Sequence, residues 1–397
     1  MSKTGVIMCR CNGLNDSINF PAIVSKLAGR KEQIPAKIMV LACNPHSFTE
    51  IKNFVAEGDV SRLVIAACPS YLKGSYFLHL AHELGIAEQY VELINIREHC
   101  AWSLPDELEA TERAVNLINM AIEKLKKVKD LGHWQAGKAF INRNKCDKCK
   151  RCVDECPNKA IELDGQGYPE VTSKCQRCGV CLGGCPLGVI SLPAFRLEEV
   201  SAMLGPVSKV KETPVAVGFF CPHACEEADL SVNHGYGYPR NLYVIPVPCT
   251  GAVNMILVND ALSMGIDGVV VGGCENSQCQ NKKGNEYALR RIKNQQQTME
   301  EMFLEKERLT YMSFGEQYLP TAIIHTDKCS RCQECVSVCP FGAIHYSEVT
   351  DTVQVQKKKC RCCGTCASSC RSGAIQLPVT SDREILASID LLASSGW

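Results

Sequence analysis

Four cysteine runs of the same spacing constrain the fold of this chain more than any other feature of its sequence. They occupy Cys146–Cys156, Cys175–Cys185, Cys329–Cys339 and Cys360–Cys370, and each reads C-x2-C-x2-C-x3-C. In such a run, three thiolates on one tight loop reach three irons of a [4Fe–4S] cubane, and the last cysteine ligates the cluster of the partner run. The runs therefore predict two pairs of [4Fe–4S] sites.

The crossing rule assigns four cysteines to each of these four sites. The first pair of runs places one cluster on Cys146, Cys149, Cys152 and Cys185 and a second on Cys175, Cys178, Cys181 and Cys156. The last pair places one on Cys329, Cys332, Cys335 and Cys370 and another on Cys360, Cys363, Cys366 and Cys339. The spacing is that of bacterial ferredoxins, so each pair predicts an α+β domain of that type. The fourth run departs slightly, with Arg371 where the others have proline and Cys362 as an extra thiol.

Zinc and disulfides are the other common uses of cysteine. Paired C-x2-C motifs also bind zinc, but eight cysteines in two crossed runs, each leading to an Ala-Ile or Val-Ile pair, favour iron–sulfur. A chain with 27 cysteines could belong to a disulfide-rich secreted class, yet residues 1–12 lack the pattern of a secretion signal. We therefore expect reduced thiolates in a cytoplasm.

Further cysteines follow short apolar runs. In residues 1–100 these runs are Gly5–Met8, Lys37–Ala42 and Leu63–Ala67, which lead to Cys9, Cys43 and Cys68. In residues 213–280 they are Val215–Phe220, Leu242–Pro248 and Gly268–Gly273, which lead to Cys221, Cys249 and Cys274. Fully apolar strands that alternate with helices predict parallel sheets covered on both faces, with sites beyond the carboxyl ends of the strands. A further apolar stretch, Arg308–Phe314, is expected to end the second sheet.

We therefore expect a multidomain α/β plus α+β protein with two parallel-sheet domains, each associated with a dicluster ferredoxin domain. The predicted divisions are a first domain (1–130), a first ferredoxin domain (131–197), a third domain (198–318), a second ferredoxin domain (319–380) and a tail (381–397). Between the first two, Leu104–Leu131 has apolar residues at helical spacing, which predicts a packing helix without chemistry.

The third domain resembles the delta subunit of methyl-viologen-reducing hydrogenase. The resemblance covers residues 213–314 and is carried by Phe220–Asp229, Val247–Gly251 and Gly272–Cys279. It implies a [2Fe–2S] cluster and electron transfer between a hydrogenase or formate dehydrogenase and heterodisulfide reductase. Two positions depart from the family pattern: Pro222 replaces a second cysteine, and Ala252 replaces a frequent arginine. The candidate ligands are Cys221, Cys225, Cys249, Cys274 and Cys279, one more than four positions need, and the spare one is left open.

The first domain resembles the amino-terminal domain of the heterodisulfide reductase A subunit. Val6–Gly13, Ala66–Pro69 and Asn95–Trp102 carry this resemblance. It implies a fifth [4Fe–4S] cluster, with four ligands drawn from Cys9, Cys11, Cys43, Cys68 and Cys100. The alternative is that these are inert buried thiols at strand ends. His99, beside Cys100, is expected to be an ordinary hydrogen-bonded histidine, as are His46 and His223.

Several classes of function have no support in the sequence. No G-x-G-x-x-G follows a strand, so we expect no flavin or nucleotide on this chain and assign the flavin to a partner. Acidic and basic residues balance at 43 each, which gives no argument for nucleic acid, and no apolar run is long enough to span a membrane.

These observations predict a cytoplasmic electron-transfer subunit of a heterodisulfide-reductase-like complex in an anaerobe. Complexes of this kind include ones that carry out flavin-based electron bifurcation. The expected partners are a flavin-containing heterodisulfide reductase A-like protein and a hydrogenase or formate dehydrogenase-type protein. On this hypothesis the chain itself is not catalytic. A second hypothesis is a thiol/disulfide-reducing enzyme with Cys11 or Cys68 as the redox-active thiol, which requires an exposed thiol of low pKa. A third is that the α/β domains carry no clusters and dock partners.

Overall fold

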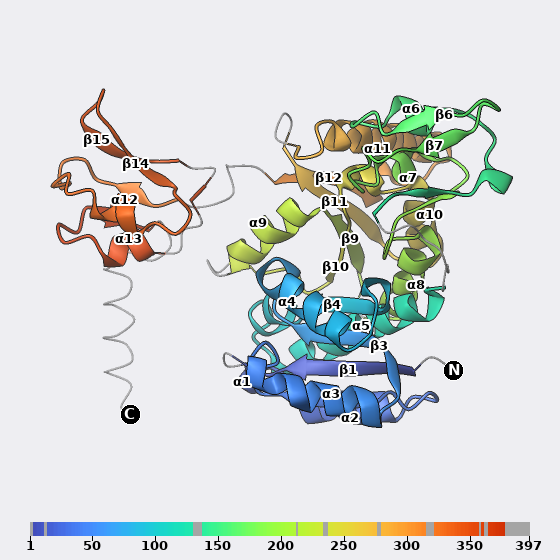
Figure 1. Ribbon diagram of the computed structural model, residues 1–397, viewed down its shortest axis with the longest axis horizontal. Coiled ribbons are helices and arrows are strands. Elements are labelled where there is room, and N and C mark those ends of the chain that lie inside the picture. The colour runs from blue at the N-terminus through green and yellow to red at the C-terminus, as the bar shows by residue number, and fades with distance from the viewer. Residues whose placement is uncertain are drawn as a thin grey trace. The chain divides into compact units, whose positions relative to one another are not determined.

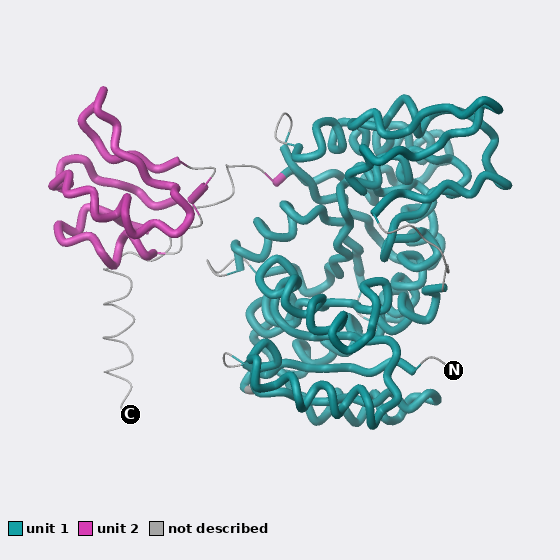
Figure 2. Tube along the Cα trace, viewed as in Figure 1, with its two compact units in different colours: residues 1–313 teal, residues 314–397 magenta. Residues whose placement is uncertain are grey.

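The computed structural model describes residues 3–11, 14–129, 137–211, 213–232, 237–275, 279–314, 321–356, 359–360 and 364–377 (Figure 1). Cys362, Cys363 and the predicted tail lie outside the described residues. The chain divides into two compact units, residues 1–313 and 314–397 (Figure 2). The finer boundaries at 130 and 197 stay predictions. No helix among the described residues is both long and apolar enough to cross a bilayer.

The first domain is built on a four-stranded sheet whose strands all run parallel, as predicted. Its strands are β1 (Lys3–Cys9), β2 (Ala36–Met39), β3 (Val60–Ala67) and β4 (Val91–Asn95), in the order β2-β1-β3-β4. Helices α2 (Phe20–Ala28) and α5 (Glu107–Lys127) pack with Val6 and Met8 on one face. Helices α3 (Phe48–Glu57) and α4 (Ser70–Glu83) pack with Ile7 on the other. Because both faces are covered, successive residues of β1 are apolar.

The third domain repeats this plan with the same strand order. Its strands are β9 (Ala216–Phe220), β10 (Leu242–Pro246), β11 (Gly268–Cys274) and β12 (Leu309–Phe314), in the order β10-β9-β11-β12. Strands β10 and β11 both run parallel to β9. The helices are α8 (Leu197–Val207), α9 (Pro222–Val232), α10 (Met255–Ser263) and α11 (Gly284–Glu301). The prediction that 308–314 ends this sheet is confirmed, because β12 is its edge strand.

Helix α5 is the predicted packing helix, and it joins the two α/β domains. Asp106 caps it by accepting a hydrogen bond from the Glu109 N–H, with acidic residues in its first turn and lysines in its last. It packs against the first sheet and against α8 (Figure 1). Ala114, Ile118 and Ala121 are fully buried in one apolar core that runs through both sheets. The two sheets are therefore held as one body within residues 1–313.

Two antiparallel ribbons form each ferredoxin-like segment. The first has β5 (Phe140–Ile141), α6 (Arg151–Asp154), β6 (Ile161–Leu163), β7 (Pro169–Val171), α7 (Val180–Gly184) and β8 (Ile190–Ser191), with β5 paired to β8 and β6 to β7. The second has β13 (Ile323–Ile324), α12 (Glu334–Val338), β14 (Ile344–Ser347), β15 (Thr352–Val355), α13 (Thr365–Ser368) and β16 (Ile375–Gln376), with β13 paired to β16 and β14 to β15. The second segment thus repeats the element order of the first.

The cysteine loops of these segments turn through left-handed backbone conformations. Lys148, Arg177 and Arg331 each stand just before the second cysteine of a run, with φ of 58°, 55° and 60°. Two of these basic side chains have local partners: the Lys148 Nζ lies 4.1 Å from the centre of the Tyr168 ring, and Arg331 pairs with Asp351 at 2.6 Å. Their contacts are therefore with neighbouring residues of their own segment.

Candidate metal centres

Four thiols of the first domain meet beyond the carboxyl edge of its sheet. Cys9 is the last residue of β1, Cys68 follows β3 directly, and Cys11 and Cys43 lie in the loops after β1 and β2. A hydrogen bond from the Cys11 thiol lowers the pKa of Cys9 to about 6, and the same bond raises the pKa of Cys11. Repulsion from Cys68 and Cys43 raises the pKa of Cys11 further. The structure therefore gathers four sulfur donors in one crevice.

Cys100 stands apart from this group. It lies in a π-helical turn, η3 (Arg97–Ala101), that follows β4, and it is fully buried among the apolar residues that pack against α5. Burial raises its pKa to about 12, and the charged group that acts on it is Arg113 rather than another thiol. Of the five candidate ligands in this domain, Cys100 is the one that lies away from the other four thiols.

The third domain brings together four thiols in the same position. The Sγ atoms of Cys221 and Cys274, at the ends of the neighbouring strands β9 and β11, lie 3.9 Å apart. Cys279 forms thiol hydrogen bonds with Cys249 and Cys274, which lower its pKa to about 2 and raise the pKa of both partners. The four thiols thus form a connected set, in which hydrogen bonding favours thiolate, the form that binds metal, at Cys279 and Cys221.

Backbone N–H groups at helix starts also favour thiolate in this set. The bond with Cys274 contributes most to a Cys221 pKa of about 7, and the amides of Ala224 and His223 at the start of α9 lower it too. Pro222, one of the two departures from the family pattern, is the first residue of α9, where a missing N–H costs nothing. A proline at position 222 is therefore compatible with the helix that begins directly after Cys221.

Cys225 lies outside this set. It sits one turn into α9, where its thiol faces the carbonyl oxygen of Phe220 at 3.7 Å. Burial raises the pKa of Cys225 well above its ordinary value, and the charge of Asp229 raises it further. Cys221 is the one candidate ligand whose charge contributes to this shift. The geometry therefore separates Cys225 as the fifth cysteine.

Thiols of the two runs of each pair act electrostatically on one another where the structure describes them, and the crossed assignment of ligands stays a prediction. Burial raises the pKa of Cys152 to about 12, and the thiols that add to this are Cys149, Cys146 and Cys185. The thiols that act most strongly on Cys181 are Cys178, Cys175 and Cys156. In the second unit, burial raises the pKa of Cys335, and repulsion from Cys329, Cys370 and Cys332 adds to the rise. A small cavity is lined by Cys339, Cys360 and Cys366. Cys363, the predicted fourth member of that group, lies outside the described residues.

The donor sets consist of thiols alone, which suits iron–sulfur clusters. Among the residues that the structure describes, no three His, Cys, Asp or Glu side chains are placed to hold a single metal ion. No disulfide joins two cysteines within the same residues. All-thiol sets of four are the usual ligands of [4Fe–4S] and [2Fe–2S] clusters, which would supply one-electron storage.

A buried polar network links the first and third domains near two of these sets. The His99 Nε2 lies 3.2 Å from the Asp229 Oδ1 of α9, and the Tyr238 hydroxyl donates to the same oxygen at 2.7 Å. The His99 and Tyr238 rings also meet edge to face. The His99 Nε2 lies beside this carboxylate but makes no hydrogen bond, so the expectation of an ordinary hydrogen-bonded histidine is not confirmed at this nitrogen. Asp229, 130 residues away, gave no signal in the sequence.

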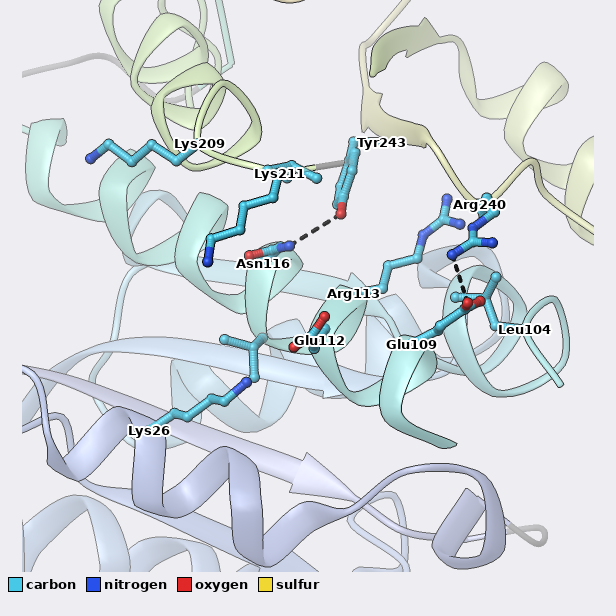
Figure 3. Close-up of a pocket in the computed structure, with 12 residues that line it drawn as sticks. Lys26, Leu104, Glu109, Glu112, Arg113, Asn116, Lys209, Lys211, Arg240 and Tyr243 are labelled. Atoms are coloured by element: carbon cyan, nitrogen blue, oxygen red, sulfur yellow. Dashed lines mark hydrogen bonds and ion pairs between the residues drawn. The ribbon is translucent and has the colours of Figure 1, made fainter. Parts of the chain in front are cut away.

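A second interdomain contact surrounds a cavity of about 250 Å³ (Figure 3). The Arg113 guanidinium of α5 donates to the carbonyl oxygen of Pro239 at 3.0 Å and to that of Leu242. Asn116 donates to the Tyr243 hydroxyl at 3.1 Å, and Arg240 pairs with Glu109 at 2.6 Å. No candidate ligand lines this cavity. These bonds attach α5 to the segment that enters β10.

Comparison with protein families bears out the resemblance to the hydrogenase delta subunit and the prediction of ferredoxin-type domains. Residues 216–324 match the family described as methyl-viologen-reducing hydrogenase, delta subunit. Residues 138–186 match a 4Fe-4S dicluster domain, and residues 322–345 match a 4Fe-4S binding domain. The chain therefore carries a delta-subunit domain and ferredoxin-type [4Fe–4S] domains.

Curated relatives come from two kinds of complex. The A subunit of the ferredoxin:CoB-CoM heterodisulfide reductase of Methanosarcina acetivorans is 30% identical over 132 residues, which is 33% of this chain and 16% of that protein. The A subunit of the ferredoxin/F(420)H(2)-dependent CoB-CoM heterodisulfide reductase of the same organism is 37% identical over 175 residues, 43% of this chain and 22% of that protein. The iron-sulfur D subunit of the F420-non-reducing hydrogenase of Archaeoglobus profundus is 40% identical over 84 residues, 21% of this chain and 61% of that protein. The chain thus spans less than two thirds of each of these relatives.

Proposed function

We propose that this chain is an electron-transfer subunit of a heterodisulfide-reductase-like complex. It relays single electrons between a hydrogenase or formate dehydrogenase-type partner and a flavin-containing heterodisulfide reductase A-like partner, in an assembly capable of electron bifurcation. The names of its relatives support this assignment, since they belong to heterodisulfide reductases and to a hydrogenase. The need to keep so many thiols reduced supports a cytoplasmic location.

The observation that carries the proposal is the repeated gathering of four thiols. Five complete sets lie in the described residues, and three members of a sixth share a cavity in the second unit. The proposed load is five [4Fe–4S] clusters and one [2Fe–2S] cluster, the latter on Cys221, Cys249, Cys274 and Cys279. On this proposal Cys9, Cys11, Cys43 and Cys68 hold the fifth cubane, and Cys100 and Cys225 are not ligands.

The contact between η3 and α9 supports a direct path between the two α/β domains. Tyr71, at the start of α4 just after Cys68, is close enough to Asp229 and Glu226 of α9 for their charges to raise its pKa, after the larger effect of burial. Arg97 acts electrostatically on Cys68 and pairs with the buried Glu98 at 2.5 Å. Helix α9 begins directly after Cys221. One helix thus connects the neighbourhoods of the two thiol sets.

The thiol-enzyme alternative receives less support. It requires an exposed thiol of low pKa, and its two candidates are Cys11 and Cys68. The Cys9 hydrogen bond raises the pKa of Cys11, and burial raises the pKa of Cys68. The thiol whose pKa is lowered in this crevice is Cys9, which is only 2% exposed.

The experiment that tests the proposal is a reductive titration of anaerobically purified protein, followed by electron paramagnetic resonance. The expected result is uptake of about six electrons per chain, one for each cluster, with both [2Fe–2S] and [4Fe–4S] signals. Uptake of two electrons and two protons by a disulfide, which becomes a dithiol, with no cluster signal from either α/β domain would favour the thiol enzyme instead.

A further inference from the structure

The first ferredoxin domain and the third domain meet at an unusually close backbone contact. Helix α7 carries Cys181 and leads to Cys185, and it packs against η5 (Thr250–Ala252), the turn that directly follows Cys249. A Cβ at Gly183 would overlap the carbonyl oxygen of Gly251, and a Cβ at Gly251 would lie 2.8 Å from a Val180 methyl carbon. Glycine on both sides lets two cysteine-bearing loops approach more closely than other residues permit.

Ala252, the second departure from the delta-subunit pattern, belongs to this contact. It is fully buried, and a Cβ at Gly179, whose φ is +78°, would lie 2.5 Å from the Ala252 Cβ. A long arginine side chain at position 252 would have no room beneath the Gly179 loop. The departure is therefore explained by the ferredoxin domain that covers this turn.

Arg291 of α11 lies at the centre of the contact and bonds to both cysteine-bearing loops. Its Nη1 donates to the Gly251 carbonyl oxygen at 2.7 Å, and its Nη2 donates to the Val180 carbonyl oxygen at 3.1 Å and to the Glu155 carboxylate. Val180 precedes Cys181, and Glu155 precedes Cys156. The Arg291 side chain is 10% exposed, so these charge-assisted bonds are largely shielded from water.

Two more side chains of the third domain reach the same loops. The buried Asn254 donates through Nδ2 to the carbonyl oxygens of Leu182 and Cys185, each at 2.8 Å. Lys282 donates to the carbonyl oxygen of Pro157 at 3.2 Å. The peptide groups beside Cys156, Cys181 and Cys185 are therefore held by the domain that carries Cys249 and Cys279.

We infer that electrons pass directly between the ferredoxin site on Cys175, Cys178, Cys181 and Cys156 and the third-domain site, across the contact of α7 with η5, with Arg291 as its positioning residue. The inference rests on the proposed function, since it requires clusters at both sites. In each transfer one site loses one electron and the other gains it; no bond forms or breaks, and no proton moves. The first ferredoxin pair then lies in series with the third-domain site.

The test compares Arg291→Gln with Arg290→Gln. Both arginines pair with Glu155, but Arg290 is 57% exposed, and its hydrogen bond there goes only to that carboxylate. Each substitution therefore removes one positive charge and one ion pair, while only Arg291→Gln releases Gly251 and Val180. The readouts are iron content, the magnetic interaction between the two reduced clusters, and the rate of transfer between them after a flash-activated reductant.

The expected result is a resolved magnetic interaction in the intact protein. We expect transfer to slow several-fold in Arg291→Gln at unchanged iron content, at most a small effect in Arg290→Gln, and partial rescue in Arg291→Lys. If Arg291→Gln does not fold, Gly183→Ala is compared with Gly165→Ala, since Gly165 has open space around it. If the intact protein has its full iron content but shows no magnetic interaction between the two clusters, the contact is not an electron route. If the transfer rate is unchanged in Arg291→Gln, Arg291 is not a positioning residue. Iron missing from the third domain overturns the proposed function itself.

Discussion

The Sγ atoms of Cys221 and Cys274 lie 3.9 Å apart, although 53 residues separate them in the sequence. They meet because β9 and β11 are parallel neighbours whose carboxyl ends share one edge of the sheet. Cys279 forms thiol hydrogen bonds with both Cys249 and Cys274, which completes the set. The same arrangement recurs in the first domain, so ligand identity can be tested one cysteine at a time.

In the third domain, Cys274→Ser is expected to remove about two irons per chain, the content of one [2Fe–2S] cluster, because a cluster short of one thiolate is lost. Cys225→Ser is the matched control, since Cys225 lies outside the connected set. Iron analysis and the [2Fe–2S] resonance are the measurements. Equal loss in the two variants would place Cys225 among the ligands.

In the first domain, Cys43→Ser is expected to remove about four irons and Cys100→Ser none. The charge of Cys43 raises the pKa of both Cys11 and Cys68, whereas Cys100 is buried in the apolar core that includes α5. Full iron in Cys43→Ser together with iron loss in Cys100→Ser would show that Cys100, and not Cys43, is a ligand.

The buried Glu199 of α8 makes stability depend on pH. Burial raises its pKa to about 7 from an ordinary 4.5, and Lys124 and Arg196 oppose the rise only in part. Between these values the folded chain keeps a proton that the unfolded chain has released, so stability falls as pH rises through this window. Glu199→Gln should therefore stabilise the protein by up to ~3 kcal/mol at pH 8 and hardly at all at pH 4.5.

Unfolding midpoints of wild type, Glu199→Gln and the half-exposed neighbour variant Glu198→Gln check this prediction. Glu198→Gln should show no such pH-dependent gain. A gain for Glu199→Gln that is equal at both pH values would mean that Glu199 does not titrate in this window.

Arg113→Met is expected to lower the free energy of unfolding of residues 1–313 by about 1–3 kcal/mol, because the carbonyl groups of Pro239 and Leu242 lose their donor in a buried setting. Lys209→Met is the control, since Lys209 is exposed in the same cavity. An unfolding midpoint equal to that of wild type would show that the contact in Figure 3 does not hold the two domains together.

The sequence predicts much of this arrangement because the relevant signals are local. Apolar runs ending at Cys9, Cys68 and Cys221 indicate parallel strands, since only strands covered on both faces are apolar throughout. The crossing of the runs follows from their spacing alone. The strand order β2-β1-β3-β4 and its repetition in the third domain agree with the expectation of one shared plan.

The remaining features depend on partners far apart in the chain. Cys225 and Cys249 are the same residue type, and what distinguishes Cys225 is its place within α9, where its thiol faces the Phe220 carbonyl oxygen. Arg291 lies in an ordinary amphipathic helix, and its partner Glu155 is 136 residues away. No spacing or motif marks such a pair, because the contact exists only after two domains have packed.

The central claim is that both α/β domains hold clusters in addition to the ferredoxin pairs. Iron and acid-labile sulfide per chain, measured on anaerobically purified protein, test it most directly. We predict about 22 of each, from five cubanes and one [2Fe–2S] cluster. A value of about 16 would contradict the claim, because only the four ferredoxin sites would then be filled.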